Sequence, residues 1–209
     1  METAMKRSGE TGQERGGEKE EVTRAATRLT RRLFCFEEVP LLEMVLELPD
    51  PAGLPAPIGA YYDALREAYF AASETLLFPR ARAAYEGDTA PGRRFSFRRY
   101  LFRLTCRAEV RGAWFSVSRR AEFIGEGLRR VSETGEVFSL SDGRLCPLSC
   151  FLGRRARRRA GKASGGRLPA RGHISLTDTG LTVYVNGRRR DVDGAFLTQF
   201  RDSDSIRGK

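Results

Sequence analysis

The sequence predicts an α+β fold: an antiparallel sheet with one long amphipathic helix packed on one face, and a second short helix. Three patterns predict this class. A strand-like alternation precedes a long segment of helical spacing, and a series of alternating segments separated by glycine-containing turns follows it. Runs of strands with segregated helices are typical of α+β domains. With 209 residues, 40% of them hydrophobic, the chain is long enough to build one sizeable core.

We expect residues 1–32 to form a disordered charged arm and residues 33–209 to form a single α+β domain. The arm mixes charges of both signs with Gly and Thr and offers little to bury. Its first 21 residues contain no apolar core, so they do not resemble a secretory signal. No apolar run approaches the roughly 20 residues that span a bilayer. We therefore expect a cytoplasmic protein without a transmembrane segment.

The first predicted strand covers residues 39–48, and four apolar side chains share one of its faces: Leu42, Met44, Leu46 and Leu48. Prolines then break the strand, and Pro57 suits the first turn of a helix, where its missing N–H costs nothing. Helical spacing over the next residues gives a wide apolar stripe of Ile58, Tyr61, Tyr62, Leu65, Tyr69, Ala72 and Leu76. We expect Pro79 to end or kink this helix at Phe78.

The rest of the chain reads mainly as strands. We expect them at residues 95–110, 113–118, 128–132 and 136–140, with a turn at Glu133–Gly135 between the last two. Residues 147–159 predict a short helix, and residues 161–172 predict a loop. A hairpin is expected over residues 174–186, and the pair Asn186 and Gly187 is a strong turn signal. A last short strand is expected at residues 196–200.

This order of motifs resembles the RsiV C-terminal-like domain family, which includes the sensing domain of a lysozyme-responsive anti-sigma factor and is also found beside peptidoglycan deacetylase domains. The likeness lies in residues 39–76, in the segments 114–117 (WFSV), 134–135 (TG) and 143–151 (GRLCPLSCF), and in residues 174–181 (ISLTDTGL). Cys150 stands where the family usually has an acidic residue. The resemblance implies the fold and a binding or sensory role.

The positive charge of the chain is concentrated in one segment. No acidic residue lies between Asp142 and Asp178, whereas this segment holds nine of the cations of a chain whose formal net charge is +10. The candidate anion-binding residues are Arg154, Arg155, Arg157, Arg158, Arg159, Lys162, Arg167 and Arg171. Such a run suits contacts with phosphates, because each neutralised phosphate releases counterions. The alternative interpretation is a solvated basic loop.

The sequence contains no set of residues typical of catalysis. It has one histidine, His173, and neither a phosphate-binding glycine loop nor a dinucleotide-binding motif. Cys146 and Cys150 have nearly the spacing of metal ligands, but no second pair accompanies them, so we interpret them as small apolar residues. We therefore expect no enzyme activity, no cofactor and no metal.

Two functions are compatible with this sequence. The first is a non-enzymatic binding or sensory module for a protein or cell-wall-related ligand, as the resemblance implies. The second is a protein that binds nucleic acid or another polyanion, such as an anionic surface, through the Arg-rich segment at residues 153–171.

Overall fold

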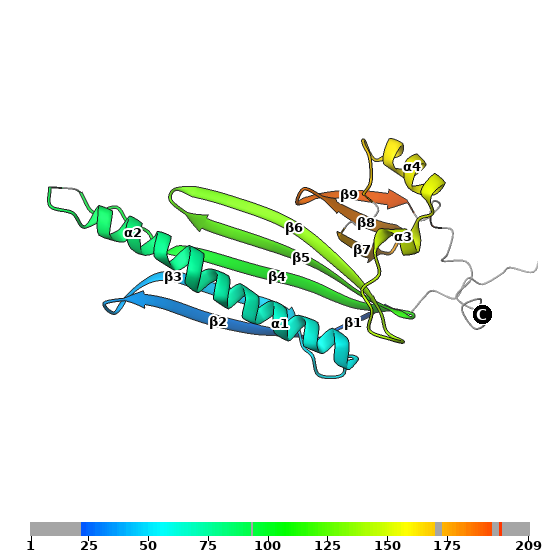
Figure 1. Ribbon diagram of the computed structural model, residues 1–209, viewed down its shortest axis with the longest axis horizontal. Helices are drawn as coiled ribbons and strands as arrows, with labels where there is room; N and C mark the ends of the chain where they lie inside the picture. Colours follow the sequence, from blue (N-terminus) through cyan, green and yellow to red (C-terminus); the bar gives the residue numbers. More distant parts are fainter. Residues whose placement is uncertain (1–21, 93, 170–172, 194–196, 198–209) are drawn as a thin grey trace, which may run out of the picture.

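The computed structural model describes residues 22–92, 94–169, 173–193 and 197 (Figure 1). It confirms the predicted α+β class. A six-stranded, mostly antiparallel sheet carries a long helix on one face, and a three-stranded sheet with two short helices packs at one end of the molecule. In the larger sheet the strand order is β2 (Thr27–Phe36), β3 (Val39–Pro49), β4 (Tyr100–Arg111), β5 (Trp114–Gly125) and β6 (Leu128–Ser139), and β1 (Val22–Arg24) also pairs with β4.

The expected disordered arm is wrong for its last part. Residues 22–32 contain β1 (Val22–Arg24) and most of β2 (Thr27–Phe36), whereas residues 1–21 lie outside the described part of the chain. β1 pairs with β4, and the chain then shifts at Ala25 and Ala26 to place β2 along the outer edge of β3. An edge strand needs only backbone hydrogen bonds and a few buried side chains, here chiefly Phe34, so it forms from a charged sequence.

The predicted strand at residues 39–48 is confirmed as β3 (Val39–Pro49), with its four apolar side chains at most 4% exposed. The helix that follows begins at Ala56, and Pro57 occupies its first turn as expected. Because this helix crosses the sheet before the next strand begins, β3 and β4 (Tyr100–Arg111) run parallel, an exception to the antiparallel prediction.

The helix does not end at Phe78. It continues as α1 (Ala56–Ala72), a π-helical turn called η1 (Ser73–Leu77) and α2 (Phe78–Asp88), and the three form one rod along the sheet (Figure 1). Within η1 the Phe78 N–H donates to the carbonyl of Ser73. Pro79, just after this turn, lacks the N–H that a regular helix would direct to the carbonyl of Thr75. A wider turn therefore absorbs the proline.

The π turn also corrects the predicted apolar stripe. Its first five members, from Ile58 to Tyr69, are buried or half-buried against the sheet. Ala72 and Leu76 are exposed instead, and Leu76 is 63% accessible. Ser73, four residues after Tyr69, continues the buried face of α1, and the extra residue in the turn brings Leu77 and Ala81 onto that face.

Strands β4, β5 (Trp114–Gly125) and β6 (Leu128–Ser139) form a long antiparallel meander. The two short strands expected at residues 128–132 and 136–140 are one continuous strand, and no turn occurs at Glu133–Gly135. The tight turn lies at Glu126 and Gly127, which both have positive φ. Gly135 serves close packing: a Cβ there would lie 2.5 Å from Cε2 of Tyr184 and 2.8 Å from the carbonyl oxygen of Ile174.

The smaller sheet contains β7 (His173–Thr177), β8 (Gly180–Val185) and β9 (Arg188–Asp193) in that order. The hairpin and the turn at Asn186 and Gly187 are confirmed, but β9 was not predicted because nearly all its side chains are charged. The last strand expected, at residues 196–200, lies outside the described residues except for Leu197. This sheet packs on the face of β5 and β6 away from the long helix, where Ser116 Oγ accepts a 2.7 Å hydrogen bond from the Leu176 N–H.

Candidate functional site

The Arg-rich segment is a packed helix and not a solvated loop. The expected single helix at residues 147–159 is divided into α3 (Leu148–Phe151) and α4 (Arg154–Ala163). Ala156, Ala160 and Gly161 are buried, and they place one side of α4 in the second hydrophobic core. Small residues at this spacing let the helix approach closely, so its long cationic side chains are left on the outer side.

Five cations meet in one open groove of about 450 Å³ beside α4: Arg154, Arg157, Arg158, Lys162 and Arg167. The first four lie within an arc of about 140° on the helix, since successive residues are separated by about 100°. Arg167 comes from the segment after the helix, which supplies the opposite wall with Gly166, Leu168 and Pro169. The groove therefore has cations on both walls.

A glycine contact folds this second wall against the helix. The Gly166 N–H donates to the carbonyl of Gly161 at 2.7 Å, and a Cβ on Gly161 would lie 2.6 Å from the Gly166 carbonyl oxygen. The side chain of Arg190, from β9, packs behind the same wall, because a Cβ on Gly166 would lie 2.7 Å from its Nη1. That nitrogen is buried without a hydrogen-bond partner among the described residues.

The cations of the groove differ electrostatically from many other arginines of the protein. Arg80, Arg111 and Arg129, for example, each lie within 4 Å of a carboxylate. No carboxylate pairs with any of the five groove cations in the part of the chain that the structure describes. An anion that approaches from solvent would reduce their mutual repulsion.

The structure places the predicted anion-binding residues in three groups. Arg154, Arg157, Arg158, Lys162 and Arg167 are brought together in the groove. Arg155 and Arg159 do not line the groove and are exposed further round the outer face of α4, and Arg171 lies outside the described residues. Sequence reasoning missed Gly166, Pro169 and Arg190. The small-residue spacing of Ala156, Ala160 and Gly161 was the signal that could have indicated a packed helix.

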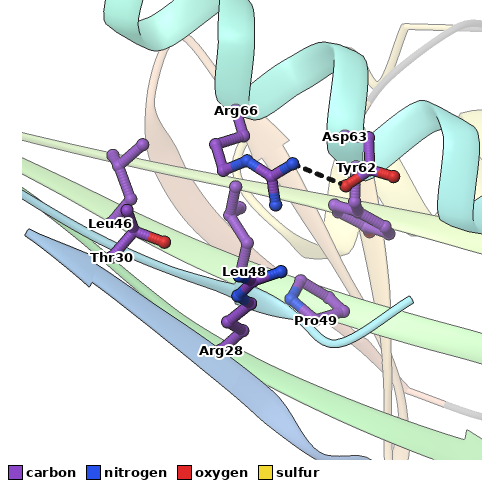
Figure 2. A pocket seen from close by; sticks show the side chains of 8 residues that line it. All are labelled: Arg28, Thr30, Leu46, Leu48, Pro49, Tyr62, Asp63 and Arg66. Carbon is purple, nitrogen blue, oxygen red and sulfur yellow. Dashed lines mark ion pairs between the residues drawn. The ribbon is translucent and has the colours of Figure 1, made fainter. Parts of the chain in front are cut away.

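Three other hollows are less suited to a ligand. The first, between α1 and the edge formed by β2 and β3, has a volume of only about 10 Å³, enough for about one water molecule. Figure 2 shows Arg66 there, paired at 2.9 Å with Asp63. The second, of about 230 Å³ between the two sheets, is lined by Arg107, Arg120 and Arg189, each with a carboxylate partner.

The third hollow, of about 560 Å³, lies between the end of α2 and the turn joining β5 and β6. It mixes apolar side chains with charges of both signs, including Arg98, Glu126 and Arg129. Tyr100 borders it. Burial and the nearby Glu126 carboxylate raise the pKa of Tyr100 to about 12, so its hydroxyl stays protonated at neutral pH. This mixture of groups selects no single class of ligand.

A polar cluster is buried under the long helix. Glu136 forms an ion pair with Arg119, and both side chains are at most 6% exposed. Its carboxylate also accepts hydrogen bonds from the hydroxyls of Tyr61 (2.6 Å) and Tyr62 (3.2 Å). Burial, with Glu136 nearby, raises the pKa of both tyrosines. Arg119 Nε and Nη1 find no partner among the described residues, so the cluster is only partly satisfied.

Among the described residues, no group of three or more His, Cys, Asp or Glu side chains is placed to hold a metal ion. Cys146 is buried and its Sγ donates to the Arg144 carbonyl, whereas Cys150 is exposed. Burial raises the pKa of Cys146 to about 11 and that of Cys106 to about 12, so both are thiols at neutral pH. His173 is exposed at the start of β7.

Searches with protein-family models and among curated proteins find no match to this chain. The resemblance to the RsiV C-terminal-like family therefore stays a prediction. Among the described residues, none of the helices has the length and apolar character needed to cross a membrane.

Proposed function

We propose that this protein is a binding protein whose ligand is a polyanion, held in the groove beside α4. The observation that carries the proposal is the meeting of five cations on two walls of that groove, where none has a carboxylate partner among the described residues. A ligand with several phosphates or sulfates would neutralise them and release the counterions that both partners hold.

An anionic membrane surface suits this site less well than a dissolved polyanion. Helices that lie on membranes insert an apolar face between the headgroups. The side of α4 opposite its cations is already buried in the protein, and the single large apolar side chain between residues 154 and 169, Leu168, is only 3% exposed. The site therefore offers charge without an anchor for the bilayer.

Binding of fluorescein-labelled heparin, followed by anisotropy at rising salt, tests the proposal. The groove variant carries R154Q, R157Q, R158Q and K162Q. A control variant loses four exposed cations elsewhere that have no carboxylate partner among the described residues: R24Q, R28Q, R94Q and R130Q. Glutamine is a good helix former, so the groove variant should keep α4.

We expect the wild type and the control variant to bind heparin with an affinity that falls steeply with salt. The groove variant should lose at least ten-fold in affinity, and the slope of log K against log salt should become shallower by about 3 to 4, because each contact contributes about one unit. Equal losses in both variants would show that only net charge matters, and the proposal would fail. The alternative is the protein or cell-wall-related ligand that the resemblance implies. If the groove variant still bound such a partner, that result would favour the alternative.

A further inference from the structure

We infer that the ligand of the α4 groove is double-stranded DNA, contacted through the phosphates of both strands with α4 lying in the major groove. This inference rests on the polyanion binding proposed above and adds the class of polyanion.

The first argument is the shape and position of α4. It spans ten residues, or about 15 Å, and Figure 1 shows it at the periphery of the molecule. The major groove of B-form DNA is about 12 Å wide and admits an α-helix. A short helix on the outside of the protein has the dimensions to enter it.

The second argument is the placement of cations on both flanks of the helix. At about 100° per residue, the cations of α4 cover an arc of about 200°, with Arg157 at one edge beside the protein groove and Arg159 exposed at the other edge. A helix in the major groove runs between two phosphate backbones, one on each side. Cations on two flanks match two strands, whereas a single strand or a small anion would need only one.

The third argument is the absence of aromatic side chains from the groove lining in the described residues. Proteins that bind single strands use aromatic rings on which the bases stack. Phe151, the aromatic residue nearest to α4 in the sequence, packs against Trp114 in the second core, with ring centroids 5.1 Å apart. The groove is therefore suited to phosphates and not to unpaired bases.

The same lining predicts little sequence preference. Between residues 153 and 169 the chain has no Asn, Gln, Asp or Glu, the side chains that most often read adenine or cytosine. Arginine and lysine contacts to phosphates position a helix without reading the sequence. We expect similar affinity for duplexes of unrelated sequence.

Anisotropy with the full-length chain tests this inference against four labelled probes of equal length: a DNA duplex, its isolated strand, an RNA duplex of the same sequence, and heparin. The RNA duplex is informative because its major groove is too deep and narrow for side chains to read. A flank variant, R155Q with R159Q, removes the cations assigned to the second strand while leaving the protein groove intact.

We expect the DNA duplex to bind at least ten-fold more tightly than the single strand or the RNA duplex. The flank variant should lose several-fold in affinity for duplex DNA, and the groove variant should lose more. Equal or tighter binding of the single strand, the RNA or heparin alone would overturn the duplex inference and leave the polyanion proposal standing. Failure of every probe to bind would overturn both.

Discussion

At the scale of single residues, the carboxylate of Glu136 holds together three side chains under the long helix. It pairs with Arg119 and accepts hydrogen bonds from Tyr61 and Tyr62. Removal of one partner from a buried ion pair leaves an uncompensated charge, which costs more than the pair gains. The cluster should therefore respond to substitution as a unit.

We expect Glu136→Leu to lower the free energy of unfolding by about 3–5 kcal/mol, because Arg119 would remain buried without a carboxylate. Arg119→Met should also destabilise the protein. The double variant should be more stable than the sum of the two single losses predicts, because neither charge is then left alone. Urea unfolding of the four proteins measures this coupling, and strictly additive losses would contradict it.

At the scale of elements, the π turn at Ser73–Leu77 lets one helix contain Pro79 and still keep a continuous buried face. The turn holds one more residue than a regular helix, so the residues on either side of it face the sheet together. Without the wider turn, the proline ring would meet the carbonyl four residues earlier.

Deletion of Thr75, an exposed residue in this turn, should convert it to regular helix without moving either buried face. The deletion should nevertheless destabilise the protein by about 3 kcal/mol, because Pro79 would then lie in a regular helix interior. Addition of Pro79→Ala should recover most of that loss. Thermal unfolding monitored by circular dichroism compares the two variants, and a lack of rescue would show that the turn has another cause.

Some of these elements, and the faces that they bury, could be predicted from the sequence. Alternation in β3 and helical spacing from Ile58 to Tyr69 gave the correct faces, because both patterns follow directly from backbone geometry. The faces of Ala72 and Leu76 were wrong, because a π turn has no pattern of its own. β1, β2 and β9 were missed, since charged edge strands depend on a neighbour to pair with.

The candidate site, too, could be predicted from the sequence only in part. The run of cations was visible in the sequence, but its groove depends on the contact between Gly161 and Gly166, which sequence spacing alone did not indicate. The helical phase of α4 determines which of its arginines line the groove. The segment after the helix brings Arg167 to the opposite wall.

At the scale of the whole molecule, the smaller sheet is held on the larger one by a few close contacts. Gly135 lies against Tyr184 and Ile174, Ser116 accepts a hydrogen bond from the Leu176 N–H, and Arg111 pairs with Asp178 at 2.8 Å across the boundary. Because α4 belongs to the core of the smaller sheet, these contacts also position the groove.

We expect Gly135→Ala to loosen this boundary, since the added methyl group would overlap both Tyr184 and the Ile174 carbonyl. Hydrogen exchange should accelerate in β7, β8 and β9 more than in β3 and β4. Gly87→Ala is the matched control, because the space around Gly87 is open and alanine suits a helix interior. Equal exchange rates in the two variants would show that Gly135 does not determine the docking.

The arginines of α4 also affect how the helix itself is maintained. Arg154 and Arg158, Arg155 and Arg159, and Arg158 and Lys162 are like charges four residues apart, an arrangement that weakens an isolated helix. Packing of its alanines must offset this strain in the free protein. Any anion that settles among these side chains removes the repulsion, so occupancy should raise the melting temperature of the segment as the ligand concentration passes its dissociation constant.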